Sequence, residues 1–167
     1  MTIYAFYIFD RHCSCIYSRE YAHASQNPGT NTSSSQLPPT SASSNLGSVN
    51  KNNNSDTAKL LFGLIYSLKN LSSKLATSDS QNLLRSFSTG AYRVHFLESL
   101  SNYKFVLLSD LDTENLQNAL WDLYSTVFLK TVVHNALSPV EFGENRISNA
   151  SFIQQSDNYL SALPVFH

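Results

Sequence analysis

Three residues near the N-terminus carry the side chains best suited to metal or thiol chemistry: His12, Cys13 and Cys15. An imidazole beside two thiols matches part of a zinc site. Structural zinc sites, however, usually pair ligands about two to four residues apart and add a second such pair, which the remaining histidines do not form. We therefore predict no metal site, and we interpret the two cysteines as small, half-buried side chains of a hairpin.

Catalytic signals are sparse in the rest of the chain. A cysteine-dependent enzyme that uses Cys13 or Cys15 with His95 stays open as an alternative, and it would require a thiol of perturbed pKa. The chain has 5 glycines, none within two residues of another, so no glycine-rich nucleotide loop can be written. Asp110 and Asp112 are interpreted as the end of a strand rather than as a catalytic pair. We expect no catalytic residue and no cofactor.

The composition argues against several partner classes. Of the 167 residues 14% are charged, with 11 Lys and Arg against 12 Asp and Glu, so no basic field exists to bind nucleic acid or anionic lipid. No run approaches the roughly 18 apolar residues of a membrane span. The segment from Met1 to Phe9 has no basic flank or cleavage site typical of a signal peptide. We expect a cytoplasmic protein that meets membranes only indirectly.

Residues 24–55 break the composition of the chain. Asn, Ser, Thr, Pro and Gly dominate this segment, and Lys51 is its sole charged residue. Because it offers few apolar side chains to offset the entropy of ordering, we expect a disordered Asn/Ser-rich loop. The segment before it is too short to fold alone. Residues 1–167 are therefore expected to form a single domain, with this loop between the second strand and the first helix.

Five segments have the composition of β-strands. Runs of β-branched and aromatic side chains extend from Ile3 to Phe9 and from Cys15 to Tyr21. After the first helix, turn signals separate three more segments: Leu83 to Thr89, Ala91 to Glu98 and Lys104 to Ser109. In the middle segment apolar residues alternate with Arg93 and His95, which predicts one buried and one exposed face.

Apolar residues at helical spacing predict two long helices, one from Asp56 to about Leu75 and one from Thr113 to about His134. Asp56 and Thr113 are the expected N-caps. A weaker helical pattern extends from Asn149 to Leu163. The order is two strands, a helix, three strands and then the helical C-terminal part. Long helices on an antiparallel sheet give an α+β layer architecture.

The first of these helices has two faces of different chemistry. A leucine stripe at helical spacing, widened by Leu61 and Ile65, is expected to face the core: Leu60, Leu64, Leu68, Leu71 and Leu75. The opposite face has residue types that protein contact surfaces enrich, and we predict a partner-binding site there: Lys59, Phe62, Gly63, Tyr66 and Lys69. Gly63 supports this interpretation, because a glycine inside a helix costs about 1 kcal/mol unless the approach of another backbone compensates. The alternative is that Phe62 and Tyr66 reach sideways over the sheet.

Four segments of the chain resemble the TRAPP subunit one (Bet-five type) family, small core subunits of the transport protein particle complex. These segments are Ile8 to Cys13, Ala58 to Gly63, Ser88 to His95 and Phe105 to Asp110. The resemblance spans nearly the whole chain except the Asn/Ser-rich loop. It implies a longin-like (SNARE-like) domain, a five-stranded antiparallel sheet between helices, which agrees with the element order above.

The resemblance also implies a function by assembly, without enzymatic activity of the chain itself. Such a subunit pairs with a synbindin-like longin subunit and contacts Bet-three-type subunits. The assembled complex tethers vesicles and exchanges guanine nucleotide on a Rab-family GTPase in endoplasmic reticulum to Golgi transport. The implied location is cytoplasmic, peripheral to the Golgi and endoplasmic reticulum membranes. A small clathrin-adaptor-like subunit for cargo sorting remains the alternative, although the segments around Arg11 and Tyr92 argue against it.

Overall fold

The computed structural model describes residues 2–21, 46–51, 56–76 and 82–164. Along the chain these residues form the following elements: β1 (Ile3–Phe9), β2 (Cys15–Tyr21), β3 (Leu46–Val49), α1 (Asp56–Lys74), β4 (Ser86–Ser88), β5 (Arg93–Glu98), β6 (Lys104–Ser109), α2 (Gln117–Asp122), the π-helix η1 (Leu123–Val133) and α3 (Ala150–Ala162). The five strands and three helical regions expected from the sequence are all present, and the α+β class is confirmed.

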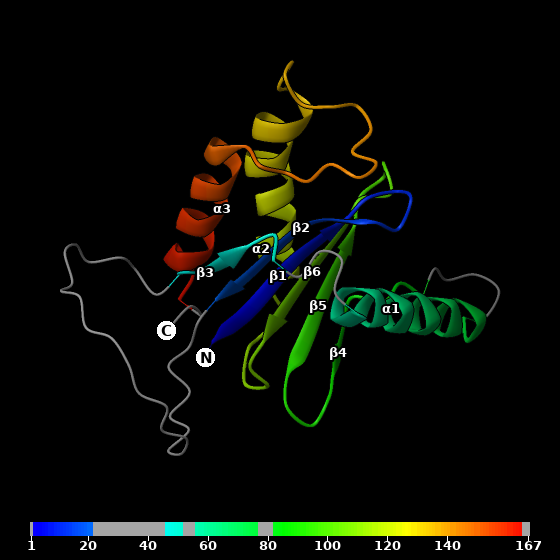
Figure 1. The fold of residues 1–167 in the computed structure, drawn as a ribbon. Helices are drawn as coiled ribbons and strands as arrows, with labels where there is room; N and C mark the ends of the chain where they lie inside the picture. The colour runs from blue at the N-terminus through cyan, green and yellow to red at the C-terminus, as the bar shows by residue number, and fades with distance from the viewer. Residues whose placement is uncertain (1, 22–45, 52–55, 77–81, 165–167) are drawn as a thin grey trace, which may run out of the picture.

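The strands form one antiparallel sheet in the order β3-β2-β1-β6-β5-β4 (Figure 1). β1 lies near its centre, and both faces of that strand are buried because apolar side chains occupy both alternating sets of positions. Ile3, Phe6 and Ile8 belong to one core cluster, whereas Tyr7 and Phe9 belong to the other. The fold therefore has two cores, one on each face of the sheet.

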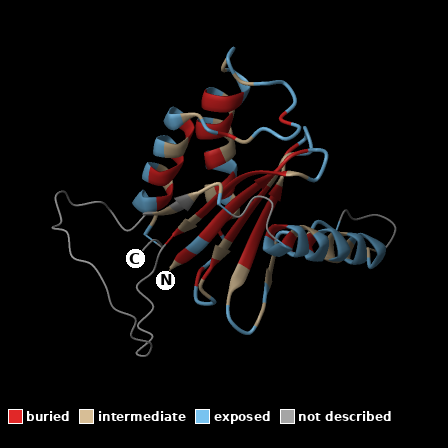
Figure 2. Cartoon of the chain, viewed as in Figure 1, coloured by how far each residue is buried: buried red, intermediate tan, exposed pale blue. Residues whose placement is uncertain are grey.

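The two faces are covered by different helices. α1 alone lies across one face, and α2, η1 and α3 cover the other (Figure 1). Buried residues are continuous from the sheet into η1 and α3, while most of α1 is exposed (Figure 2). The sheet thus has a thick helical layer on one side and a single helix on the other.

A sixth strand, β3, comes from the segment expected to be a disordered loop. β3 pairs with β2 at the sheet edge, so that prediction is wrong for residues 46–51. Asn50 ends the strand with a φ of 57°, and its amide oxygen accepts a hydrogen bond from the backbone nitrogen of Ser18 at 3.1 Å. Residues 24–45 and 52–55 of the expected loop lie outside the described residues.

The second long helix begins later than expected and changes its winding. Its N-cap is Leu116, without a capping side chain, and Thr113 is a buried turn residue whose N–H donates to Asp110. From Leu123 onward the chain follows a π-helix, in which hydrogen bonds connect residues five apart. Val132 is among the buried residues of this π-helix. Asn149 caps α3 by accepting a hydrogen bond from the N–H of Ser151 at 2.9 Å.

Candidate functional site

The inward face of α1 is formed by Ala58, Leu61 and Ile65, which are all buried. Their spacing of three and four residues is that of one face of an α-helix. They pack in the same cluster as Phe9 and Phe96 of the sheet. The small side chain of Ala58, 1% exposed, permits close contact between the first half of the helix and the strands.

The leucine stripe of α1 lies on the outside, so the predicted core face is right for Leu61 and Ile65 and wrong for the leucine stripe itself. Leu68 is half-buried, and the other four are largely exposed: Leu60 73%, Leu64 43%, Leu71 53% and Leu75 70%. Both stripes of the helix repeat at helical spacing, and the period therefore does not decide which one meets the sheet.

The five predicted partner-binding residues fall into two groups. Lys59, Gly63 and Tyr66 are exposed, whereas Phe62 and Lys69 are half-buried. The Phe62 ring lies 5.4 Å from the Phe9 ring, and the Lys104 Nζ lies 5.9 Å from the Phe62 ring centroid. Phe62 therefore reaches sideways over the sheet, as the alternative interpretation expected.

Lys69 and Tyr66 lie next to Phe62, between the sheet and the exposed side of α1. Lys69 forms an ion pair with Glu98 of β5, which ties the second half of α1 to the sheet. The Tyr66 ring stacks against the Phe62 ring with centroids 6.2 Å apart and remains more than half exposed. Of the predicted site, Lys59, Gly63 and Tyr66 are available to another molecule.

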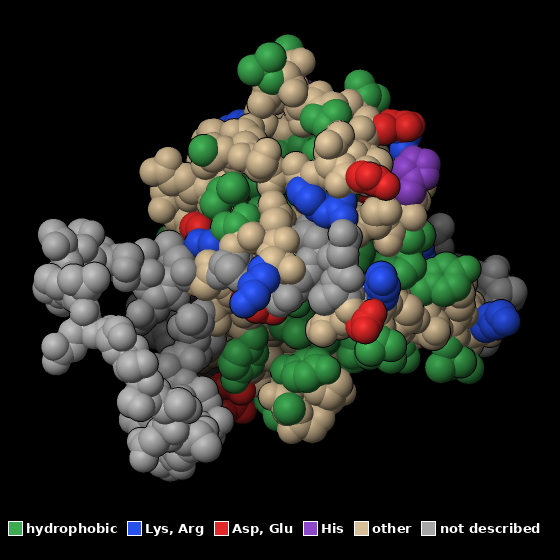
Figure 3. All heavy atoms as spheres, viewed as in Figure 1, with side chains coloured by type: hydrophobic (Ala, Val, Ile, Leu, Met, Phe, Trp, Pro, Cys, Tyr) green, Lys and Arg blue, Asp and Glu red, His purple; other side chains and the backbone are tan. Residues whose placement is uncertain are grey.

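We define the outer surface of α1 as the exposed leucines with Gly63, Tyr66 and Ser67. Gly63 and Ser67 are four residues apart and therefore lie in one row along the helix. A Cβ atom added at Gly63 would have no neighbour within 4 Å, so the packing of this chain does not require a glycine there. Hydrophobic side chains gather on the α1 side of the molecule, with lysines beside them (Figure 3). The result is an apolar strip beside a row of small residues.

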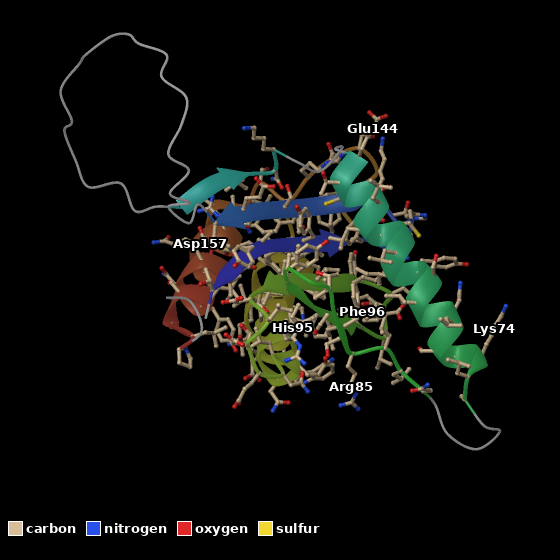
Figure 4. The ribbon with its side chains drawn as sticks, turned by 90° about the horizontal axis from the view of Figure 1, so that it is seen from below. Lys74, Arg85, His95, Phe96, Glu144 and Asp157 are labelled. Atoms are coloured by element: carbon tan, nitrogen blue, oxygen red, sulfur yellow. The ribbon has the colours of Figure 1, made fainter. Side chains whose placement is uncertain are left out.

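A groove of about 950 Å³ continues this surface at the C-terminal end of α1. It is lined by the end of the helix, by residues 82–85, by the second half of β5 and by Trp121 of α2. β4 pairs with β5 only as far as His95, and Phe96 donates one further backbone hydrogen bond to Arg85. In Figure 4, Arg85 and Phe96 lie near this edge of the sheet, beside α1. Sequence patterns did not indicate the groove, because it is built from segments distant in the chain.

The thiols and His95 do not form a catalytic pair. Cys15 is buried in the α1-side cluster, and burial raises the pKa of its thiol to about 12, so the thiol stays protonated. Cys13 is exposed and lines a small cavity beside Phe62 of α1. His95 faces the other side of the sheet, toward α2 (Figure 4). This arrangement contradicts the cysteine-enzyme alternative.

His95 was expected to be exposed and is instead fully buried, because α2 covers that face of β5. Its Nδ1 accepts a hydrogen bond from the backbone N–H of Leu116 at 3.4 Å, so the proton lies on Nε2, which donates to Ser109 at 2.9 Å. Burial, helped by the charge of Arg93, lowers the pKa of His95 to about 4. The neutral imidazole therefore serves as a structural link between β5, β6 and the start of α2.

In the part of the chain that the structure describes, no group of three or more His, Cys, Asp or Glu side chains is arranged to hold a metal ion. The helices of that part also include none with the length and apolar character needed to cross a membrane.

Asp110 acts as a turn residue, since its carboxylate accepts a hydrogen bond from the N–H of Leu111 at 2.8 Å.

An antiparallel sheet with one helix on one face and a helical layer on the other, in this element order, defines a longin-like α+β domain. The chain belongs to the Sybindin-like family, whose model matches residues 3–163. The resemblance found in the sequence motifs is thereby confirmed.

Similar proteins of known name cover nearly the whole chain. The chain is 38% identical over 173 residues to "Trafficking protein particle complex subunit BET5" of Saccharomyces cerevisiae, an alignment that covers 98% of each protein. It is 28% identical to "Transport protein particle subunit bet5" of Schizosaccharomyces pombe, covering 99% of this chain and 100% of that protein. It is 26% identical to "Trafficking protein particle complex subunit 1" of Rattus norvegicus, covering 99% and 97%.

Proposed function

We propose that this protein is a noncatalytic core subunit of a transport protein particle complex in vesicle traffic. The family membership and the names of three relatives that match over nearly their full length support this proposal. In the complex the chain pairs with a synbindin-like longin subunit, contacts Bet-three-type subunits and helps to dock a Rab-family GTPase. The proposed location is the cytoplasmic side of the Golgi and endoplasmic reticulum membranes.

The observation that carries this proposal is the outer surface of α1. Four leucines and Tyr66 are exposed on one helix that the other described residues cover on its inner side only. Full burial of a leucine side chain is worth about 1.5–3 kcal/mol relative to exposure, so the strip represents on the order of 5 kcal/mol of unused apolar burial. Contiguous apolar surface of this kind marks a protein contact site. The row of Gly63 and Ser67 would let a partner's backbone approach closely.

We infer that this contact surface contributes to nucleotide exchange by assembly. Release of a bound nucleotide from a GTPase makes and breaks no covalent bond, so a subunit contributes by holding other chains in position. The outer surface of α1 and the groove beside Trp121 offer apolar contact for this purpose. The Rab-family GTPase would then meet a composite surface made by several subunits.

Reconstitution with matched variants tests the proposal. The triple variant Leu60→Ser, Leu64→Ser and Leu71→Ser removes apolar contact from the outer surface of α1. We expect it to bind the synbindin-like and Bet-three-type subunits at least about tenfold more weakly, equivalent to 1.4 kcal/mol. Its thermal midpoint should stay close to that of the parent chain, because these side chains are exposed.

The matched control replaces three exposed apolar residues elsewhere: Val133→Ser, Leu137→Ser and Val140→Ser. This control should assemble normally and support nucleotide exchange by the complex at the parental rate. The proposal fails if both triple variants assemble equally well. It also fails if the complex lacking this chain exchanges nucleotide as fast as the complete one.

A further inference from the structure

The two edges of the sheet are built differently. β4 is a three-residue edge strand with serines at both ends and Arg85 before it. β2 is seven residues long, and all its residues except Glu20 are buried. Short edge strands resist pairing with other molecules, whereas a long edge strand offers a longer row of backbone N–H and C=O groups for strand addition. Without a covering strand, β2 would be more prone to strand addition than the β4 edge.

β3 covers this edge of β2. The two strands are antiparallel, with Arg19 opposite Val49 and Tyr21 opposite Leu46. At the end of β3 the backbone N–H of Asn50 donates to the carbonyl of Ser18 at 2.7 Å. The strand therefore occupies backbone groups of β2 that an added strand would use.

Side chains fasten β3 to the rest of the domain from both ends. Arg19 donates to the carbonyl of Gly47 at 2.6 Å and forms a two-pronged ion pair with Asp157 of α3, at 3.1 and 2.6 Å. The Asn50 amide nitrogen donates to the carbonyl of Ile147 at 2.8 Å, just before α3. β3 is thus tied to α3 as well as to β2.

Arg19 has a second consequence for the edge. Charged side chains protect an edge strand whether they point outward or inward. In β2 the charge of Arg19 points inward and is paired with Asp157, with the two side chains 7% and 10% exposed, while Glu20 is half-buried. Because Arg19 also donates to the carbonyl of Gly47, the same side chain holds β3 over the β2 edge.

We propose that β3 closes the sheet edge against a second copy of this chain. The occupant that β3 excludes is another β2, because two identical antiparallel strands can pair across a two-fold axis. Closure of this edge keeps the chain from self-association and confines contacts with other subunits to α1 and the β4 side. The inference is independent of which complex the chain joins.

Two substitutions at Asn50 test the role of β3. Asn50→Pro removes the N–H that Ser18 accepts and cannot adopt the φ of 57°, so it detaches the end of β3. Asn50→Gly loses the same side-chain hydrogen bonds but keeps the N–H and tolerates the positive φ, which makes it the matched control. Both variants are made in the full chain. Hydrogen exchange of the β2 backbone amides and the molecular mass over a concentration series are measured.

We expect Asn50→Pro to show at least a doubled mass that rises with concentration, with β2 amides protected by the second copy. The control should keep the parental mass, and its β2 amides should exchange faster than those of the parent but more slowly than those of the proline variant at concentrations too low for pairing, because it loses only the side-chain hydrogen bonds of Asn50. If the proline variant exchanges its β2 amides at least about tenfold faster yet keeps the parental mass, an open β2 edge does not recruit a second copy and the proposal is wrong. Parental mass together with parental exchange would equally overturn it, because β3 would then not depend on the Asn50 turn.

Discussion

The two faces of the sheet differ in how completely the helices on them are buried. On the face of α2, η1 and α3, the core includes Phe6, Phe105, Phe128 and Phe152, which are fully buried. Aromatic rings of the strands and helices pack edge to face there; the ring centroids of Phe105 and Phe128, for example, are 5.1 Å apart. On the other face α1 buries three residues and exposes a leucine strip (Figure 2).

This difference indicates a division of labour. The helical layer encloses the larger of the two cores, so we expect it to contribute most of the unfolding free energy. The α1 side has a smaller core, an adjoining groove and apolar surface that no other described element covers. A subunit that works by assembly requires one self-sufficient face to fold and a second face to offer to its neighbours.

The largest effect is expected from Phe128→Ala in the helical layer. Removal of a fully buried ring leaves a cavity and costs about 3–5 kcal/mol of unfolding free energy. Urea denaturation measures this loss. Leu100→Ala, at a fully exposed residue, is the control and should change the unfolding free energy by less than about 0.5 kcal/mol. A loss at Phe128 no larger than at Ile65 of α1 would refute the proposed division of labour.

Acid should destabilise the chain through the same face. In the folded chain the pKa of His95 is about 4, so its imidazole stays neutral above that pH. In the unfolded chain the same imidazole has a pKa near 6.5 and takes up a proton there. The unfolded state therefore binds more protons between these values, and the stabilisation present above pH 6.5 is lost as the pH falls toward 4, by about 3 kcal/mol.

The comparison of parent, His95→Gln and His134→Gln isolates this effect from the titration of carboxylates. The His95→Gln variant should lose less unfolding free energy than the parent between pH 6.5 and pH 4, because glutamine does not titrate. His134 is exposed, and its variant should follow the parent curve. Parallel curves for all three proteins would show that the buried imidazole does not govern acid stability.

Adjacent residues of α1 permit a finer test of its orientation. Ile65→Ala removes a buried side chain of the smaller core and should lower the unfolding free energy by about 2 kcal/mol. This is the low end for such substitutions, because the small cavity beside Phe62 allows some relaxation. Leu64→Ala, one position away on the outer surface, should cost less than about 0.5 kcal/mol. Thermal and urea unfolding of the isolated chain measure both. Reversed magnitudes would mean that the leucine stripe faces the sheet after all.

Local sequence patterns predicted the elements better than their orientation. β1 and β2 have the predicted bounds, and α1 ends one residue earlier than expected. The pattern failed on the rotation of α1, because Leu60 and Leu61 both belong to stripes of helical period. It failed at His95 because a polar residue in an alternating strand usually faces water, and no local signal showed that α2 would cover it.

Long-range contacts account for the other misses. β3 lies in an Asn/Ser-rich segment with little strand propensity, and contacts from Arg19 and Asn50 to distant parts of the chain fasten it. Lys59, Gly63 and Tyr66 of the predicted partner site are exposed, and their role in partner binding stays a prediction. Phe62 could not be placed from the helix alone, since its contact is Phe9 of β1.

The smallest effect, and the most informative about the outer surface of α1, is expected from Gly63→Ala. In the isolated chain the added methyl group meets no atom within 4 Å, and alanine is the better helix former, so the chain should gain about 0.5–1 kcal/mol of unfolding free energy. In the complex the same methyl group would stand between α1 and a partner's backbone and should weaken assembly.

If a partner's backbone requires glycine at position 63, Gly63→Ala should raise the unfolding free energy of the isolated chain and weaken its assembly into the complex. Ser67→Ala is the control, since it changes the neighbouring small residue, which donates to the carbonyl of Gly63, without adding bulk. It should leave assembly unchanged. If Gly63→Ala stabilises the chain and assembles as well as the parent, no backbone approaches the helix at this point. The partner's contact would then be restricted to the leucine strip, because the strip and the glycine row are separate features of the same helix.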